Sequence, residues 1–193
     1  MNVPRLPLTA AEAVGVGKTG QAPARPAILL PGSFNPVHAG HWRLADAAAR
    51  RLGAEVAFEL SVANVDKAAL TPEEVERRLA QFADRADVWL TRAPTFVDKA
   101  RLFPGVVFVV GADTAARVVC GRYYGDERAL EHAIQAIRDL QCRFLVAPRT
   151  DASGCLLTAH AIAMPPVWRP LFEAIDPAEF RVDLSSTQLR TQS

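Results

Sequence analysis

The stretch from residue 31 to residue 41, Pro-Gly-Ser-Phe-Asn-Pro-Val-His-Ala-Gly-His, constrains the fold more than any other part of the chain. It follows a short apolar run at 27–30 and precedes an alanine-rich segment at 41–52 whose pattern predicts a helix. A strand, a glycine turn and two histidines at the start of a helix suit phosphate binding, because a helix N-terminus offers free backbone N–H groups and favours an anion. The sequence therefore predicts a phosphate site where this strand ends.

Individual residues of this stretch support that prediction. Gly32 lies where the strand ends, and the absence of a side chain would let backbone N–H groups approach a ligand. His38 and His41 are three residues apart, so on the first helical turn they would project to one side and donate hydrogen bonds to phosphate oxygens. Gly40, between them, would let a phosphate approach the backbone. Two of the chain's four histidines fall in this turn, which disfavours an ordinary structural role for them.

Strands and helices are expected to alternate along the rest of the chain. Strands are expected at 27–30, 55–62, 87–91, 106–110, 143–147 and 180–182, with a strand or hairpin arm at 154–159, and helices at 41–52, 71–82, 96–102, 114–119, 126–140 and 168–174. This order predicts an α/β fold in which a mainly parallel sheet carries helices on both faces. Ligands of such sheets bind beyond the carboxyl ends of the strands, which is where residues 31–41 lie.

Composition and charge exclude several other classes of protein. A chain of 193 residues fits one domain, and its 22 basic and 21 acidic residues give a net charge of +1 without a basic tract for nucleic acid. The longest apolar run, 106–110, is far shorter than the ~20 residues of a membrane span. The first residues show no leader pattern, so we expect a cytoplasmic protein. The three cysteines lack metal-binding spacing and are expected to be buried free thiols.

The first 26 residues are expected to form a flexible N-terminal arm, because they are rich in proline and show no sustained periodicity. Within this arm, Gly15 to Thr19 reads Gly-Val-Gly-Lys-Thr and is similar to a phosphate-binding loop. The loop pattern needs a glycine where this chain has Glu12, and a preceding strand, which we do not expect here. We therefore interpret residues 15–19 as a flexible turn.

Two motifs near opposite ends of the chain identify a family. Residues 32–41 resemble the G-x-F-x-P-x-H-x-G-H signature of the nucleotidyltransferase superfamily that shares the HxGH motif, and residues 184–190, Leu-Ser-Ser-Thr-Gln-Leu-Arg, resemble its I-S-S-T-x-I-R motif. The resemblance covers residues 27–190. It implies a Rossmann-like three-layer α/β/α fold, with a nucleotidyltransferase domain over residues 27–193.

The second motif also has a physical interpretation of its own. Ser185 and Ser186 can cap a helix, Thr187 adds a hydroxyl group, and Arg190 would project from the first turn. This would be a second helix start able to bind an anion, with a guanidinium beside it. The alternative is a plain capped C-terminal helix, and the histidine motif at the other end of the chain favours the first interpretation.

A glycine turn and an acid follow the apolar run at 106–110. The segment Gly111-Ala112-Asp113 places a carboxylate at the carboxyl end of a strand, which suits a nucleotide sugar or base. It is similar to the G-x-D segment with which the mononucleotide adenylyltransferase branch of the family contacts the adenosine part of ATP. The alternative is that Asp113 only caps a helix.

Three residues are candidates for binding the acceptor. Lys67 follows the second expected strand, where relatives place a lysine that contacts phosphates and the acceptor, although a surface lysine is the alternative. Trp89 resembles the aromatic residue that stacks on a pyridine ring in this branch, although core packing explains it equally well. Asn35, in the Phe-Asn-Pro form of the motif, is the third. Two neighbouring arginines, Arg77 and Arg78, are interpreted as part of a solvated helix face.

The resemblance implies an adenylyltransferase that transfers AMP from ATP to nicotinamide or nicotinate mononucleotide and releases pyrophosphate, in NAD biosynthesis or salvage. His38, His41 and Arg190 would be the catalytic residues and would act on developing charge rather than as bases. Mg²⁺ would enter mainly with ATP. The residues expected to bind ATP are Gly32, Ser33, Phe34, Gly40, Gly111, Asp113, Ser185, Ser186 and Thr187.

Alternatives to this reaction stay open. Residues 122–125 depart from the tryptophan-bearing segment of well-known members, so the acceptor could be another phosphate, such as pantetheine phosphate or an alcohol phosphate, with ATP or CTP as donor. The chain could also be a non-catalytic nucleotide-binding module, although the complete set of motif residues argues against this. A fragment of a class I aminoacyl-tRNA synthetase shares the histidine motif, but the chain is short and lacks a basic face. The sequence leaves open the oligomeric state and the role of residues 122–125.

Overall fold

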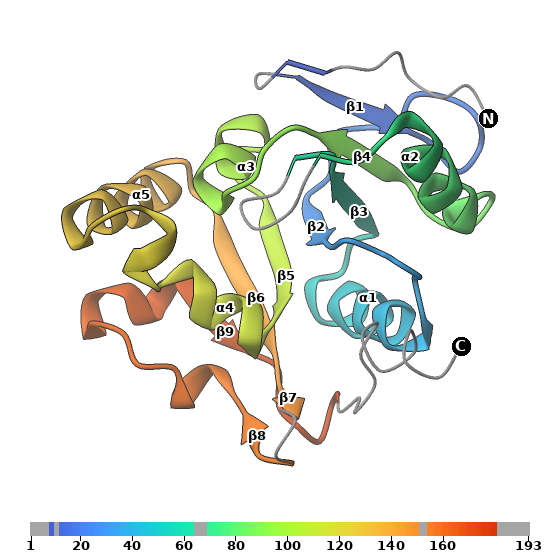
Figure 1. Ribbon diagram of the computed structural model, residues 1–193. Helices are drawn as coiled ribbons and strands as arrows, with labels where there is room; N and C mark the ends of the chain where they lie inside the picture. The colour runs from blue at the N-terminus through green and yellow to red at the C-terminus, as the bar shows by residue number, and fades with distance from the viewer. Residues whose placement is uncertain (1–7, 10–11, 64–68, 151–153, 181–193) are drawn as a thin grey trace.

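A seven-stranded sheet forms the centre of the molecule (Figure 1). The computed structural model describes residues 8–9, 12–63, 69–150 and 154–180. In spatial order the strands are β1 (Ala13–Val16), β4 (Val88–Thr91), β3 (Val56–Ser61), β2 (Ile28–Pro31), β5 (Val107–Gly111), β6 (Arg143–Ala147) and β9 (Phe172–Ala174). All neighbours are parallel except β1, which is antiparallel to β4. Two further strands, β7 (Arg149–Thr150) and β8 (Leu156–Leu157), pair in a small separate hairpin.

Helices cover both faces of this sheet (Figure 1). One face carries α1 (Ala39–Leu52) and α2 (Pro72–Leu79), and the other carries α3 (Phe96–Leu102), α4 (Ala112–Val118) and α5 (Glu127–Asp139). Short 3₁₀ turns lie at 80–82, 121–123, 159–161 and 166–171. These three layers confirm the prediction of a Rossmann-like α/β/α fold with a mainly parallel sheet.

Alternating side chains of the central strands build a separate core on each face. In β2, Ile28 and Leu30 belong to the core beneath α1 and α2, whereas Leu29 between them belongs to the core beneath α3, α4 and α5. The fully buried run Val107–Val110 of β5 divides in the same way. A strand buried on both faces needs apolar residues at every position, which is why these runs show no alternation in the sequence.

The strand order places the histidine-containing stretch at the point where the topology reverses. From β2 the chain moves outward to β3 and β4 on one side, and then returns to add β5 and β6 on the other side. Ligands in parallel sheets bind at this kind of switch point, beyond the carboxyl ends of the strands. Residues 31–41, called the histidine turn below, begin at the last residue of β2 and end in the first turn of α1.

Two predicted helix starts can be compared with the structure. Thr71 caps α2 and Pro72 is its first residue, as a Thr-Pro pair followed by two glutamates predicts, and the Glu74 side chain additionally completes a capping box. Helix α1 begins two residues earlier than expected, at Ala39, because the side chain of His38 itself serves as the N-cap. The cap therefore brings both histidines into the first turn.

Three elements differ from the expectations. Residues 13–16 of the expected arm form β1 and pair with β4, so this part of the arm is not loosely held. The helix expected at 168–174 is a 3₁₀ turn that ends at Leu171 and is followed by β9, because Phe172 pairs with Phe144 of β6. The last strand therefore comes earlier than 180–182. Phe180 is not in a strand, and residues 181–182 lie outside the described residues.

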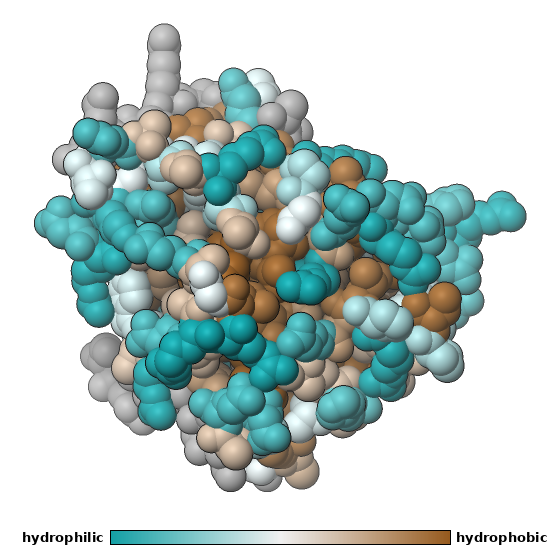
Figure 2. Space-filling model, turned by 180° about the vertical axis from the view of Figure 1, so that it is seen from behind, coloured by the Kyte–Doolittle hydropathy of each residue, from teal (hydrophilic) through white to brown (hydrophobic). Residues whose placement is uncertain are grey.

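The surface mixes polar and apolar side chains. Seen from the side opposite to Figure 1, hydrophilic residues surround a central area where hydrophobic residues reach the surface (Figure 2). The three cysteines are free, but only Cys142 is buried, while Cys120 is half-buried and Cys155 is exposed, so the expectation of burial is confirmed for one of them. None of the helices in the described part of the chain combines the length and apolar character of a membrane span.

Candidate active site at the histidine turn

The two histidines of the turn are held by the backbone at the start of α1. Nδ1 of His38 accepts a hydrogen bond from the N–H of Gly40 (3.1 Å), and Nδ1 of His41 accepts one from the N–H of His38 (3.2 Å). The ring centroids of His38 and His41 are 3.9 Å apart. Because both Nδ1 atoms act as acceptors, the proton of each neutral ring is assigned to Nε2. The histidine turn thus presents two neighbouring Nε2–H donors.

The electrostatic surroundings keep these rings neutral. Burial, the neighbouring His38 ring and the guanidinium of Arg149 lower the pKa of His41 to about 3. Burial and Arg149 also lower the pKa of His38 below its usual value. Arg149 is the first residue of β7 and follows the carboxyl end of β6, so this strand brings a positive charge toward the same edge of the sheet. The site therefore combines neutral donors with a nearby cation, which suits an anionic ligand.

Phe34 supports the histidine turn from inside the core. Its side chain is fully buried, with a backbone φ of 45°, and its ring lies edge-on to the ring of His41 at a centroid distance of 5.1 Å. Only its backbone is left for the ATP contact that we expected of Phe34. A Cβ atom on Gly32 would lie 2.6 Å from the Phe34 ring, and the Gly32 N–H donates to the carbonyl of Glu59 (2.9 Å). Gly32 thus makes room for Phe34, and its own N–H is engaged by β3.

Helix α2 and the turn after it hold the histidine turn from the other side. The Gln81 side chain donates to the Phe34 carbonyl (3.1 Å) and accepts from the N–H of Val37 (2.9 Å). The guanidinium of Arg78 donates to the carbonyl of Ser33 (2.8 Å), and that of Arg77 donates to Oδ1 of Asn35 (2.8 Å). These contacts span the irregular backbone between β2 and α1, whose Asn35–Pro36 bond is cis.

This arrangement corrects the interpretation of Arg78 as a solvated residue. The Arg78 side chain is buried, with only 5% of the residue exposed, whereas Arg77 is exposed as expected. Nε of Arg78 has no hydrogen-bond partner within the described ranges. A buried guanidinium is costly unless it is hydrogen-bonded, so its bonds to Ser33 and Glu74 explain why it is tolerated behind the turn.

A pocket of about 300 Å³ opens beside the histidine turn, at the carboxyl ends of β2 and β3. We call it the Glu59–Lys99 pocket. Its lining comes from the end of β2 and the turn, from β3, from the start of α3, and from α4 and the turn that follows it. The residues are Pro31, Gly32, Ser33, Glu59, Ser61, Pro94, Thr95, Phe96, Lys99, Thr114, Arg117, Val118, Tyr123 and Tyr124.

A buried ion pair lies in this pocket. Nζ of Lys99 lies 2.8 and 2.9 Å from the two carboxylate oxygens of Glu59 and 2.7 Å from the carbonyl of Ala93. The hydroxyl of Thr91 also donates to Oε1 of Glu59. Glu59 and Lys99 are 1% and 5% exposed. Taking two charges out of water is expensive, so a buried pair in a pocket wall is a feature that core packing alone does not require.

Another side of the pocket is formed by Arg117, Tyr123 and Tyr124. Burial and the Asp98 carboxylate raise the pKa of the Tyr124 hydroxyl to about 12, so Tyr124 stays neutral. The Arg122 guanidinium lies over the Tyr123 ring at 4.8 Å. Arg117 of α4 is exposed at the edge of the pocket. Residues 122–125, whose role the sequence leaves open, therefore contribute Tyr123 and Tyr124 to this pocket.

Three other candidate residues, Gly111, Asp113 and Trp89, are among the described residues. Gly111 and Asp113 lie at the carboxyl end of β5, next to β2, but they do not line the Glu59–Lys99 pocket. Gly111 is the N-cap of α4 and Asp113 is exposed in its first turn, so Asp113 is not the helix cap of the alternative interpretation. Trp89 of β4 is the register partner of Glu59 in β3 but does not line the pocket; its ring packs against Phe103 at 5.3 Å, and its buried Nε1 has no partner in the described part of the chain.

Several candidate residues fall outside the described residues. These are Lys67 and the C-terminal motif residues Ser185, Ser186, Thr187 and Arg190. Their roles stay predictions from the sequence. Within the described ranges there is also no group of three or more His, Cys, Asp or Glu side chains that could hold a metal ion.

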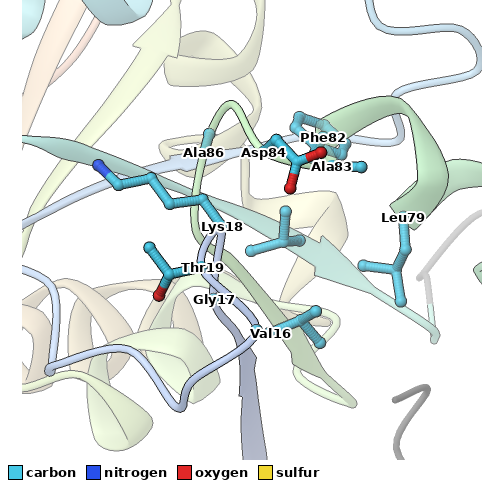
Figure 3. Close-up of a pocket in the computed structure, with 11 residues that line it drawn as sticks. Val16, Gly17, Lys18, Thr19, Leu79, Phe82, Ala83, Asp84 and Ala86 are labelled. Carbon is cyan, nitrogen blue, oxygen red and sulfur yellow. The ribbon is translucent and has the colours of Figure 1, made fainter. Parts of the chain in front are cut away.

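The glycine-rich segment at 15–19 contributes to a different pocket, shown in Figure 3. This pocket of about 350 Å³ lies between the turn after β1 and the end of α2, with Val16 and Leu79 among its lining residues. A strand does precede the segment, contrary to our expectation, but the next regular element of the chain is β2 rather than a helix. Nζ of Lys18 is paired with Glu55 at 2.8 Å. Residues 15–19 are therefore not a phosphate-binding loop, but the expected turn covers only their second half, because Gly15 and Val16 belong to β1.

Sequence reasoning missed most of the pocket. A signal for Glu59 exists, because it is an acid inside the apolar strand Val56–Ser61. Lys99 gives no such signal, since a lysine on a short helix is normally solvated. Arg149 is found only by noticing that a basic residue follows the buried strand β6 after a single proline.

The chain is an α/β protein with a mainly parallel sheet and a histidine-bearing helix start at its switch point, and sheets of this kind typically bind ligands at that place. The chain belongs to the cytidylyltransferase-like family, whose family model matches residues 29–192. Membership implies a nucleotidyltransferase activity in general, which confirms the superfamily that the two motifs resemble. No curated protein matches the chain at a significant level of similarity.

Proposed function

We propose that this protein is an adenylyltransferase that joins AMP from ATP to a pyridine mononucleotide, nicotinamide or nicotinate mononucleotide, and releases pyrophosphate. This would be a step of NAD biosynthesis or salvage. The observation that carries the proposal is the pair of neutral Nε2–H donors, His38 and His41, on a turn whose first residues line a pocket with tyrosine side chains and a buried ion pair.

The histidines would stabilise charge rather than move protons. The phosphate of the mononucleotide attacks the α-phosphorus of ATP and needs no general base, because it is already ionised at neutral pH. A ring such as His41, with a pKa of about 3, is a poor base but a good hydrogen-bond donor through Nε2. Donors held in place by the backbone stabilise the charge that develops on the transferring phosphoryl group.

The Glu59–Lys99 pocket would hold the acceptor. Gly32 and Ser33 of the histidine turn line one side of it, where the reacting phosphate would lie, so the pyridine ring would extend from there toward the tyrosines and the buried pair. The face of a tyrosine ring attracts a cation, and Tyr123 and Tyr124 would therefore favour the positively charged pyridinium. Asn35 would contact the acceptor from the histidine turn. Trp89 does not line this pocket, so a stacking role for it would need a rearrangement.

The donor would occupy the other side of the histidine turn. Gly111 and Asp113, at the end of β5, would contact the adenosine. Ser186, Thr187 and Arg190 would hold the β- and γ-phosphates and stabilise the leaving pyrophosphate, and Lys67 would approach the phosphates from the second strand. Mg²⁺ would arrive as part of the ATP complex, because triphosphate oxygens are the ligands this ion prefers.

The test is a panel of donors and acceptors. The full chain is incubated with Mg²⁺ and either ATP or CTP, together with each pyridine mononucleotide, pantetheine phosphate or an alcohol phosphate, and pyrophosphate and the joined product are measured. We expect product from ATP and a pyridine mononucleotide. Product with only another acceptor or with CTP would refute the acceptor or the donor, and nucleotide binding without any product would indicate a non-catalytic module.

A further inference from the structure

We propose that the buried pair Glu59–Lys99 makes this pocket select a neutral, hydrogen-donating carboxamide over a carboxylate, so that nicotinamide mononucleotide is preferred to nicotinate mononucleotide. This inference rests on the proposed function, because it assumes that the ring of a pyridine mononucleotide enters the pocket. It goes further by assigning the discrimination between the two acceptors to named residues.

Lys99 cannot serve a carboxylate, although its ammonium group lies in the wall of the pocket. A lysine ammonium has three N–H donors. All three are used, by the two oxygens of Glu59 at 2.8 and 2.9 Å and by the carbonyl of Ala93 at 2.7 Å. A ligand carboxylate would therefore have to break one of these buried bonds before Lys99 could donate to it.

Glu59, in contrast, retains capacity to accept. An ionised carboxylate has about four lone-pair sites. Oε1 accepts from Lys99 and from the Thr91 hydroxyl, whereas Oε2 accepts only from Lys99 among the residues that the structure describes. The remaining site on Oε2 can take an N–H of a carboxamide. A ligand carboxylate in the same place could not bond to Oε2, because both groups only accept hydrogen bonds and neither supplies a proton.

Two hydroxyl groups near the buried pair, those of Ser61 and Thr95, do not favour a carboxylate. The hydroxyl of Ser61 already donates to backbone carbonyls, and the hydroxyl of Thr95 donates to Asp98, so neither has a donor to spare for a ligand carboxylate. Arg117 is a cation that could attract a carboxylate, but it is exposed at the edge of the pocket. Solvent and salt screen an exposed charge far more than a buried one.

Burial turns this mismatch into selectivity. Glu59 and Lys99 are 1% and 5% exposed, so water cannot compensate for a bond that the ligand fails to make. Because the pair is neutral as a whole, the preference comes from the pattern of donors and acceptors rather than from net charge. A site built around hydrogen bonds to one ligand rejects an analogue that cannot make them.

The experiment compares kcat/KM for the two mononucleotides at saturating ATP and Mg²⁺, with dissociation constants of the same ligands from calorimetry. For the wild-type chain we expect a preference of about tenfold or more for the amide. Equal use, or a preference for nicotinate mononucleotide, would overturn the inference while leaving adenylyl transfer in place. If neither mononucleotide binds or reacts while another phosphate is adenylylated, the acceptor of the proposed function is wrong and this inference falls with it.

Variants then test the assignment to the pair. The double variant Glu59→Gln/Lys99→Met removes both buried charges together and is expected to reduce the preference to within about threefold, because the glutamine amide can donate as well as accept. Arg101→Met, on the exposed face of α3, is the matched control and is expected to keep the wild-type ratio. A folded double variant with the full preference would contradict the assignment. If the double variant does not fold, two other ratios of kcat/KM test the inference, those of the wild-type chain and of Arg117→Met. Both are expected to favour the amide.

Discussion

The backbone N–H of His38 donates to Nδ1 of His41 at 3.2 Å, so one histidine of the turn orients the other. His38 in turn accepts from the N–H of Gly40 and caps helix α1. In an ordinary capping box this exchange is made by serine or threonine with glutamate. Here the same two hydrogen bonds select the tautomer of both rings, and they direct the two Nε2–H groups away from the helix.

Replacing His41 should abolish most of the activity but lower the stability of the fold only slightly. His41→Ala removes one donor to the developing charge and is expected to lower kcat by about 10²–10³. The lost cap should cost about 1 kcal/mol of unfolding free energy. His132→Ala, at an exposed position on α5, is the matched control. Wild-type turnover in a folded His41→Ala chain would rule out the role given to this residue.

The low pKa of His41 predicts a dependence of stability on pH. In the unfolded chain the ring takes up a proton near pH 6.5, and in the folded chain only near pH 3. Between these values the unfolded state binds more protons, so the free energy of unfolding should fall as the pH is lowered, by up to about 1.4 kcal/mol per pH unit for this group. Above pH 6.5 the effect vanishes.

Urea unfolding of the wild-type chain and of His41→Asn, at pH 7 and at pH 5, measures this effect. Asparagine cannot be protonated in this range, so the variant should lose less stability than the wild-type chain on acidification. Equal losses in the wild-type chain and His41→Asn would show that His41 is not held neutral.

Gln81 should matter for activity although it lies outside the histidine turn. Gln81→Leu removes the bonds to the Phe34 carbonyl and the Val37 N–H. We expect a loss of about 1–3 kcal/mol in unfolding free energy and a drop of about tenfold or more in kcat/KM for ATP, because the turn is no longer held in position. Gln135→Leu, on the exposed face of α5, should change neither quantity. An intact kcat/KM in Gln81→Leu would show that the turn keeps its shape unaided.

A methyl group at position 32 should not be tolerated. In Gly32→Ala the added Cβ would meet the Phe34 ring at 2.6 Å, and Phe34 is packed against His41, Phe58 and Phe82 and cannot move freely. We expect a loss of about 1–3 kcal/mol in stability, together with displacement of His41 and reduced turnover. Gly121→Ala has open space around its Cβ and serves as the control. Calorimetric melting of both variants checks this, and equal melting temperatures would contradict it.

The sequence was sufficient to predict the framework of the fold. Buried parallel strands such as Val107–Gly111 appear as continuous apolar runs, and the cap at Thr71 is a local signal that tertiary contacts do not override. The histidine turn could be predicted because its glycine, proline and histidine spacing is specific. β1 escaped prediction because four residues with a central glycine carry too little pattern.

The Glu59–Lys99 pocket could not be predicted from the sequence, for a different reason. Glu59, Lys99 and Arg78 are charged residues that become buried only through partners distant in the sequence. The partner of Lys99 is 40 positions away and that of Arg78 is 45 positions away. Local propensity assigns such residues to the surface, so their positions emerge only from the packed structure.

The most direct test of the central proposal is the identity of the product formed from ATP, Mg²⁺ and nicotinamide mononucleotide, followed by ³¹P NMR and mass spectrometry. The proposal predicts a dinucleotide and pyrophosphate in equal amounts, formed about 10²–10³ times more slowly by His41→Ala at the same enzyme concentration. Absence of a dinucleotide from either pyridine mononucleotide, while the chain is folded and binds ATP, would contradict the proposal.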